Sequence, residues 1–262
     1  MADFPEGAPC WVDAMFPDLE AGKRFYGELL GWTFEAGSPE YGNYTQAFSD
    51  GKNVAGVSPT MPGMEGTPPA WTVYLASPDV SATAEKITVN GGQVMMGPME
   101  VGEFGKMLIA QDPGGVVFGV WEAGTHKGFQ KIGEPGSFAW VEFMVRETGG
   151  VDSFYPAVYP LQTRQIGEGK EFDYLVLEAG GKPVAGRYKM DETIPAEVPS
   201  HALVYFAVDD CDDAVDKVRK LGGQVRTAAR TTPFGRMAVV GDQQGAVFAV
   251  IDPSTTEGEP PM

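Results

Sequence analysis

The chain repeats itself at a nearly constant offset, and this internal duplication constrains its fold more than any other feature. Trp11 and Phe25 recur 129 residues later as Trp140 and Phe154. Further pairs follow at offsets of 130 or 131 residues: 54–56 with 184–186, Tyr74 with Tyr205, Asp112 with Asp242 and Phe118 with Phe248. A repeat of this length indicates two copies of a domain rather than a solenoid of short repeats.

Length and composition agree with two domains. The 262 residues give room for two domains of ordinary size, and a hydrophobic content of 43% is ample for two cores. A formal net charge of −17 argues against binding to nucleic acid or to an anionic membrane. No apolar run approaches the length of a bilayer span, and the N-terminus shows no signal region. We therefore expect a cytoplasmic protein, monomer or homodimer, whose partner is a small molecule.

Cysteine and histidine are scarce and are not duplicated. Cys10 and Cys211 lie in unrelated parts of the two copies, so we expect both to be buried free thiols. His126 falls between the copies and His201 precedes a predicted strand, and neither has a counterpart in the other copy. A duplicated metalloenzyme would carry histidines at equivalent positions, so this distribution argues against one.

Each copy has the pattern of two modules, and each module has one strand, one helix and three strands. In the first copy, residues 11–16 alternate like a strand, and an apolar stripe over 19–30 predicts a helix that Asp18 caps. The other elements predicted for this copy are strands at 44–48, 54–57, 71–76, 94–96, 107–111 and 116–121 and a helix at 80–90. We predict a first domain at 1–123, a linker at 124–136 and a second domain at 137–252. The last residues, 253–262, are predicted to be a disordered tail.

The order of these motifs resembles the glyoxalase/bleomycin-resistance/extradiol-dioxygenase superfamily, also called vicinal oxygen chelate proteins. The resemblance rests on Phe-Tyr at 25–26, Leu-Gly-Trp at 30–32 and Asp-Pro-Gly-Gly at 112–115, and it covers about residues 8–252. The chain is similar in the order of its motifs to two-domain proteins labelled glyoxalase-like, hydroxylase or 27-kDa antigen. The resemblance implies an α+β fold in which paired βαβββ modules form two curved mixed sheets, with helices outside, each around a cleft. A divalent metal usually lies in such a cleft.

At the metal-ligand positions of this family, the present sequence has unsuitable side chains. The ligand on the opening strand corresponds to Trp11 and Trp140, and the ligand on the final strand corresponds to Gly119 and Ala249. Indole, hydrogen and methyl groups offer no lone pair to a divalent ion, which needs imidazole, carboxylate or thiolate. We therefore predict that neither cleft holds a metal and that the protein uses no cofactor.

Two interpretations of the tryptophans remain open. Trp11 and Trp140 have the strand parity that faces the predicted clefts. They either fill the space that a metal would occupy or form flat walls against which a planar or apolar ligand stacks. The small residues Gly119 and Ala249 beside them would leave room for such a ligand.

Asp13 and Glu142 share the parity of the tryptophans, so both carboxylates should point into the clefts. An aromatic, partly desolvated cleft would raise the pKa of a carboxylate, which suits general acid/base catalysis. The alternative is a structural carboxylate that caps a backbone amine or pairs with Arg24, Arg146 or Arg187.

Recurring tyrosines and methionines complete the candidate ligand-binding residues. Tyr74 and Tyr205 occupy equivalent strand positions and would donate a hydrogen bond to a ligand carbonyl, although buried core tyrosines are an equal alternative. Met15 and Met144 would form adaptable cleft walls, but methionine fills cores equally well.

Two functions of different classes follow from these residues. The first is a metal-independent protein that binds a small apolar or planar molecule in aromatic clefts. The second is a glyoxalase-type lyase or a hydroxylase or dioxygenase, acting on a small carbonyl or aromatic substrate with Asp13 or Glu142 as general acid/base. Membership of a fold family does not decide between them, because function depends on the site.

Overall fold

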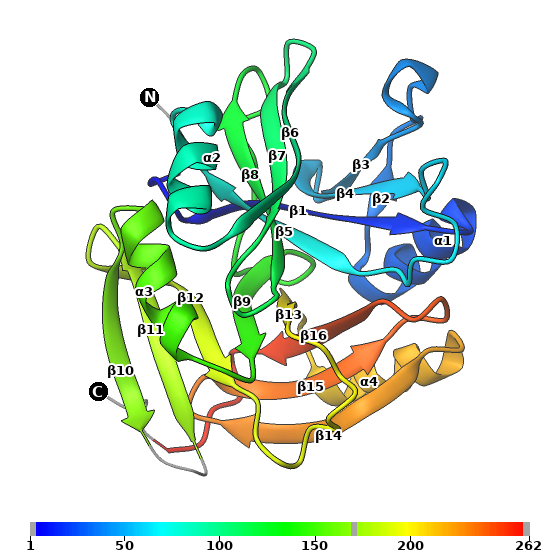
Figure 1. Cartoon of the computed structure of the whole chain (residues 1–262). Helices are drawn as coiled ribbons and strands as arrows, with labels where there is room; N and C mark the ends of the chain where they lie inside the picture. The colour runs from blue at the N-terminus through cyan, green and yellow to red at the C-terminus, as the bar shows by residue number, and fades with distance from the viewer. Residues whose placement is uncertain (1–3, 169–171, 259–262) are drawn as a thin grey trace. The chain divides into compact units, whose positions relative to one another are not determined.

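The structure is a computed structural model that describes residues 4–168 and 172–258, and Figure 1 labels its elements. Each copy repeats the series strand, helix, three strands twice. The first copy contains β1 (Pro9–Phe16), α1 (Leu19–Leu30), β2 (Thr33–Phe34), the 3-10 helix η1 (Pro39–Tyr41), β3 (Thr45–Ser49), β4 (Lys52–Pro59), β5 (Trp71–Ala76), α2 (Val80–Val89), β6 (Gln93–Val101), β7 (Gly105–Gln111) and β8 (Val117–Ala123). The second copy contains β9 (Phe138–Val145), α3 (Gly149–Val158), β10 (Gln162–Glu168), β11 (Asp173–Ala179), β12 (Lys182–Lys189), β13 (His201–Ala207), α4 (Cys211–Lys220), β14 (Gln224–Thr232), β15 (Gly235–Gly241) and β16 (Val247–Asp252).

The strands form two eight-stranded mixed sheets with the same topology. Their orders are β2-β3-β4-β1-β5-β8-β7-β6 and β10-β11-β12-β9-β13-β16-β15-β14. In both sheets the opening strand of a module pairs in parallel with the last strand of that module, as β1 does with β4 and β9 with β12. The predicted α+β fold of duplicated βαβββ modules is therefore confirmed.

The chain divides into two compact units that do not coincide with the two copies. Unit I comprises Met1–Trp11, Thr72–Gly128 and Val141–Leu203. Unit II comprises Val12–Trp71, Phe129–Trp140 and Val204–Met262. Unit I thus combines the second module of the first copy with the first module of the second copy, and unit II combines the remaining two. The domain boundaries predicted from the repeat describe the copies, and they stay a prediction.

Local signals fix the first helix as expected. The Asp18 carboxylate accepts a hydrogen bond from the Ala21 amide, and Gly31 ends α1 with a left-handed φ of 72°. The Phe16 ring packs so closely beneath α1 that a Cβ on Gly22 would lie 2.8 Å from it. Phe16 is fully buried beneath this helix.

A buried tyrosine–aspartate pair joins the two modules within each unit. In unit II the Tyr26 hydroxyl donates to Asp242 Oδ2 at 3.0 Å, and in unit I Tyr155 donates to Asp112 Oδ2 at 3.0 Å. Each carboxylate also accepts backbone amides of its own turn. Burial raises the pKa of both Asp112 and Asp242, and the hydrogen bonds only partly offset that effect.

The segments predicted as linker and tail carry specific contacts. In the linker, Lys131 is buried and donates to Ser49 Oγ and to Asp50 Oδ2, at 2.9 and 2.8 Å. In the tail, residues 253–258 begin as a turn, in which Asp252 accepts from the Ser254 amide at 2.9 Å. The last four residues of the predicted disordered tail, 259–262, lie outside the described residues. No helix in the described part of the chain is long and apolar enough to cross a membrane.

Candidate functional site

Asp13 forms a carboxylate–tyrosine pair in unit II. It is half-buried and has the opposite strand parity to Phe16, so it lies on the face of β1 that points away from α1. The Tyr44 hydroxyl donates to Asp13 Oδ2 at 3.3 Å. Asp13 is in register with Gly56 of β4, where any Cβ would overlap the Tyr44 hydroxyl. Glycine at position 56 therefore gives the tyrosine room to reach the carboxylate.

Unit I has the same arrangement at the equivalent positions. Glu142 is half-buried and in register with Gly186 of β12, and a Cβ on Gly186 would overlap the Tyr174 hydroxyl. The neighbouring Phe143 stacks on Tyr155 of α3 at 4.5 Å, so Glu142 lies on the face of β9 away from that helix. Both copies thus place a carboxylate and a phenol on the same face of the sheet beside a glycine.

An aromatic platform, defined as Phe172, Tyr174 and Tyr188, adjoins this position in unit I. The Phe172 and Tyr174 rings are stacked with nearly parallel planes, at an interplanar angle of 6° and with centroids 5.8 Å apart. Tyr188 pairs with Tyr174 across β11 and β12, and its ring meets both others edge to face. Phe172 is 43% exposed, so the platform presents a large aromatic surface to solvent. In the first copy Gly42 and Ser58 replace Phe172 and Tyr188, and only the tyrosine recurs, as Tyr44.

Trp11 lies in unit I against a residue of the linker. Its ring meets the His126 imidazole edge to face at 4.4 Å, and the same imidazole lies 5.6 Å from the Trp121 ring. Trp121 Nε1 donates to the His126 carbonyl oxygen at 3.0 Å. Desolvation by burial lowers the pKa of His126 to about 4, so its imidazole is neutral at pH 7. Trp11 itself is buried and only 4% exposed.

The space predicted beside Gly119 is filled by Tyr74. The two residues are in register on β5 and β8, and a Cβ on Gly119 would overlap the Tyr74 ring. In unit II, Tyr205 is in register with Ala249, and both are buried. The small residues thus accommodate a neighbouring tyrosine, at least in unit I, because side chains in register on adjacent strands compete for the same face.

The remaining candidate residues divide between the units. Trp140 and Met15 are half-buried in unit II, and Met144 is buried in unit I. Unit II therefore brings together five of the candidates that the sequence indicates, namely Asp13, Met15, Trp140, Tyr205 and Ala249. Unit I brings together the other five, namely Trp11, Tyr74, Gly119, Glu142 and Met144.

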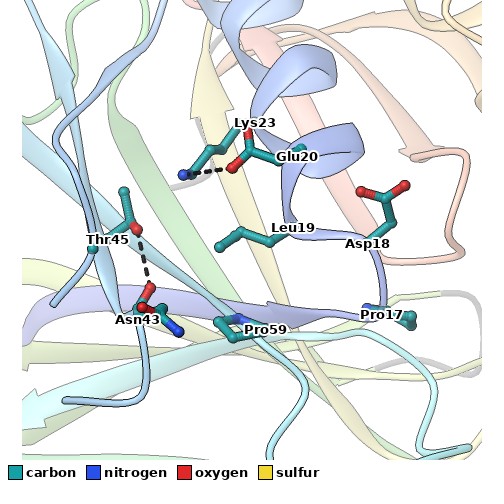
Figure 2. A pocket seen from close by; sticks show the side chains of 9 residues that line it. Pro17, Asp18, Leu19, Glu20, Lys23, Asn43, Thr45 and Pro59 are labelled. Carbon is teal, nitrogen blue, oxygen red and sulfur yellow. Dashed lines mark hydrogen bonds and ion pairs between the residues drawn. The ribbon is translucent and has the colours of Figure 1, made fainter. Parts of the chain in front are cut away.

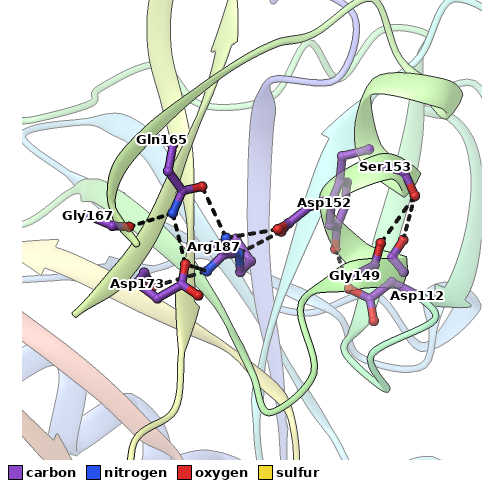
Figure 3. Close-up of polar contacts among 10 residues, drawn as sticks. Asp112, Gly149, Asp152, Ser153, Gln165, Gly167, Asp173 and Arg187 are labelled. Carbon is purple, nitrogen blue, oxygen red and sulfur yellow. Dashed lines mark hydrogen bonds and ion pairs between the residues drawn. The ribbon is translucent and has the colours of Figure 1, made fainter. Parts of the chain in front are cut away.

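A fully buried arginine lies on the helix side of unit I (Figure 3). Arg187 of β12 is 1% exposed, and its guanidinium contacts Asp152 of α3 through two hydrogen bonds of 2.7 and 3.0 Å. It also donates to Asp173 Oδ1 at 2.6 Å and to the Asp173 carbonyl at 3.1 Å. Desolvation acts to raise the pKa of Asp173, but the hydrogen bonds from Arg187 and Gln165 outweigh it and lower that pKa. Arg187 is thus engaged with Asp152 and Asp173 rather than with Glu142.

A pocket of about 570 Å³ occurs in unit II between the start of α1 and the strands β3 and β4 (Figure 2). In Figure 2, Leu19 and Lys23 extend from the helix side toward the pocket, and Asn43, Thr45 and Pro59 lie across from them. The complete lining is Pro17, Asp18, Leu19, Glu20, Lys23, Gly37, Asn43, Thr45 and Pro59.

Sequence reasoning missed Tyr44, Tyr174 and Phe172. A signal for the first two was present, because Tyr44 and Tyr174 are separated by the same 130 residues as many other repeated positions. Phe172 has no counterpart in the first copy, and its position against Tyr188 depends on the pairing of β11 with β12. Among the described residues, no group of three or more His, Cys, Asp or Glu side chains is arranged to hold a metal ion.

Comparison with known proteins identifies the family. Residues 11–120 and 139–250 both match the sequence model of the Glyoxalase/Bleomycin resistance protein/Dioxygenase superfamily. The chain is 38% identical over 259 residues to "Putative glyoxylase CFP32" of Mycobacterium bovis, with 97% of each chain covered. It is 39% identical over 265 residues to "Anthracycline biosynthesis protein DnrV" of Streptomyces peucetius, covering 96% of this chain and 95% of that protein. The chain therefore belongs to the glyoxalase/bleomycin-resistance/dioxygenase superfamily.

Solved structures show the same fold at low sequence identity. The Mn(II)-bound glyoxalase from Novosphingobium aromaticivorans has a TM-score of 0.65 at 14% identity, covering 97% of this chain and 86% of that one. The 2,3-dioxygenase LapB from Pseudomonas sp. KL28 has a TM-score of 0.65 at 12% identity, covering 95% of this chain and 93% of that one. These similarities support the fold and say nothing about the site.

Proposed function

We propose that this protein binds a small planar or apolar molecule without a metal ion. The aromatic platform of unit I carries this proposal, because Phe172 presents an exposed ring that lies nearly parallel to the Tyr174 ring. Exposed aromatic faces of this kind stack planar ligands, and edge-to-face neighbours such as Tyr188 hold them rigid. Glu142 on the same face would accept a hydrogen bond from a ligand hydroxyl or amine.

The residues at the family's metal positions support a metal-independent role. Trp11 and Trp140 replace the ligand on the opening strand, and Gly119 and Ala249 replace the ligand on the final strand. The Tyr74 ring covers Gly119, so the place of the missing ligand is taken by an aromatic side chain. This donor set does not fit a divalent ion.

The name of one relative agrees with a ligand of this chemical class. One of them is named for anthracycline biosynthesis, and anthracyclines are planar, fused-ring molecules. The other is named as a glyoxylase, which fits the second candidate function below.

Binding of a planar probe tests the proposal. Titration with 1,4-dihydroxyanthraquinone should quench tryptophan fluorescence, and Phe172→Ala should weaken binding about tenfold, which corresponds to about 1.4 kcal/mol for a lost stacking face. Phe234→Ala is the matched control, because Phe234 is 52% exposed in unit II away from the platform. Equal weakening by the two variants, or by neither, would contradict binding at the platform. Trp11→Ala and Trp140→Ala then separate the two interpretations of the tryptophans, since a ring that only fills space changes stability without changing affinity.

The carboxylate–tyrosine pair of unit II favours a second candidate, a lyase or hydroxylase acting on a small carbonyl or aromatic substrate. The Asp13 carboxylate would remove a proton from a carbon next to a carbonyl. The Tyr44 hydroxyl, which donates to Asp13 without a ligand, would then donate its hydrogen bond to that carbonyl oxygen instead. Glu142 and Tyr174 would do the same in unit I.

Proton exchange distinguishes the enzyme from the binding protein. The protein should catalyse exchange of deuterium from D₂O into the carbons flanking the carbonyl of hydroxyacetone, followed by proton NMR. Asp13→Asn combined with Glu142→Gln should abolish the exchange while leaving the fold intact. If the wild-type protein gives no exchange above that of buffer, this second candidate is wrong and the first is unaffected.

A further inference from the structure

We propose that the pocket of unit II, between α1 and the strands β3 and β4, is a separate binding site for a small organic acid. It lies on the helix side of the sheet, whereas Asp13 and Tyr44 lie on the opposite face. The proposal is therefore independent of the function proposed above.

The equivalent position in unit I shows how this space is normally filled. Val57 of β4 and Arg187 of β12 occupy equivalent positions in the two copies. Each directly follows the glycine that pairs with the carboxylate residue of the opening strand. The Arg187 guanidinium occupies the space beneath α3 and contacts Asp152 and Asp173. In unit II the shorter Val57 is fully buried and does not line the pocket of about 570 Å³, whose walls include Lys23 and Asn43.

The polar groups around the space have also changed: one carboxylate is replaced by a cation and the other by a neutral amide. Asp152 corresponds to Lys23, since these residues precede the paired tyrosines Tyr155 and Tyr26 by three positions. Asp173 likewise corresponds to Asn43, which directly precedes Tyr44 as Asp173 precedes Tyr174. Two carboxylates that hold a cation are thus replaced by an ammonium and an amide, which are hydrogen-bond donors. The ligand that matches this exchange carries an acceptor with negative charge.

The remaining walls define the rest of the ligand. The side chain of Lys23 is 18% exposed, and its Nζ lies 2.9 Å from Glu20 Oε1. The Glu20 side chain is 69% exposed and can turn into solvent when a ligand carboxylate takes its place beside Lys23. Leu19, Pro17 and Pro59 supply apolar surface, so the structure assigns this pocket to a carboxylate with a small apolar or aromatic body.

Fluorine NMR with three probes of the same shape tests the site in the full-length chain. 4-Fluorobenzoate should show line broadening with wild-type protein at millimolar concentration or below, 4-fluorobenzamide should bind more weakly, and 4-fluorobenzylamine should not bind. Lys23→Met should weaken 4-fluorobenzoate at least fivefold, and Lys86→Met serves as the control because Lys86 is 48% exposed and lies in the other unit. Phe172→Ala should leave the broadening unchanged, which separates this pocket from the aromatic platform.

A second variant tests the argument from the copies directly. Val57→Arg with Lys23→Asp and Asn43→Asp recreates in unit II the side chains that fill unit I, and it should abolish 4-fluorobenzoate binding without loss of thermal stability. Binding that is unchanged in Lys23→Met, stronger binding of 4-fluorobenzylamine than of 4-fluorobenzoate, or no binding to wild-type protein would each overturn the proposal. If the triple variant fails to fold, Lys23→Met alone decides the outcome.

Discussion

Unit I and unit II each combine the first module of one copy with the second module of the other, yet their first modules have diverged on both faces of the sheet. On the helix side, unit I holds the buried Arg187 with its two carboxylates, whereas unit II has Val57 and a pocket. On the opposite face, unit I carries the exposed Phe172 on its platform, whereas unit II has Gly42 at the equivalent position. The tyrosine–aspartate pair between modules is retained in both. The comparison indicates that a few buried contacts preserve the duplicated backbone while the surrounding side chains are free to change function.

Among the substitutions that test this comparison, removal of the buried arginine should lower the free energy of unfolding most. Arg187→Met leaves Asp152 and Asp173 as partly buried carboxylates without their counter-charge. The side chains of these aspartates are 33% and 18% exposed, so we expect a loss near the lower limit for a broken buried pair, about 3 kcal/mol of unfolding free energy. Urea denaturation measures it.

The surface pair between Arg236 and Asp212 provides the control for that experiment. Their side chains are 28% and 62% exposed, and Arg236→Met should therefore cost less than about 1 kcal/mol. If both arginine variants lose the same amount of stability, the buried network of unit I is no more important than a surface contact, and the contrast between the units disappears.

Substitution of the tyrosines that join the modules should cause the next largest loss of stability, and this loss should differ between the units. Tyr155→Phe removes one hydrogen bond to the buried Asp112, which costs about 1–2 kcal/mol. Tyr26→Phe should cost about 1 kcal/mol more, because Tyr26 also accepts a hydrogen bond of 2.9 Å from Trp71 Nε1. Thermal or urea unfolding measures both.

Tyr159→Phe is a matched substitution with the opposite expectation. Among the described residues, the Tyr159 hydroxyl is the buried side-chain group that has no hydrogen-bond partner. Its removal should leave stability unchanged or raise it slightly, because a buried unpaired hydroxyl is itself a cost. A loss as large as that of Tyr26→Phe would show that these tyrosine hydroxyls stabilise the fold by filling space and not by hydrogen bonding.

At neutral pH the titration of His126 should have the smallest effect, and the acid sensitivity that it contributes below neutral pH should belong to unit I. The imidazole has a folded-state pKa of about 4 because of desolvation, against about 6.5 in an unfolded chain. The unfolded state therefore binds the proton first as the pH falls, and stability is lost from about pH 6.5 downward to about pH 4. Above pH 6.5 the imidazole is neutral in both states and contributes nothing.

His126→Gln should remove that part of the acid sensitivity. Unfolding free energies of wild type and variant, measured between pH 7.5 and 4.5, should converge or cross as the pH falls. His201→Gln is the comparison, since desolvation also lowers the pKa of His201. A constant difference between wild type and His126→Gln across this range would show that the imidazole is not buried against Trp11.

The sequence by itself determined the duplication, the modules and the face on which several residues lie. The bounds of α1 follow from the Asp18 cap and from Gly31, and the parity of β1 separates Phe16 from Asp13. These signals act over a few residues, because capping bonds and side-chain alternation are local properties of the backbone. The family followed from the order of such local motifs.

The tertiary structure alone decided which modules pack into each unit and which side chains meet. Tyr26 reaches Asp242 across 216 residues, Tyr44 reaches Asp13 across 31, and the His126 ring lies against Trp11. The filling of Gly119 by Tyr74 and the pocket between α1 and the strands β3 and β4 also depend on how distant strands and helices pack. Register and packing between distant strands arise from the whole core, so they cannot be obtained from the periodicity of any single segment.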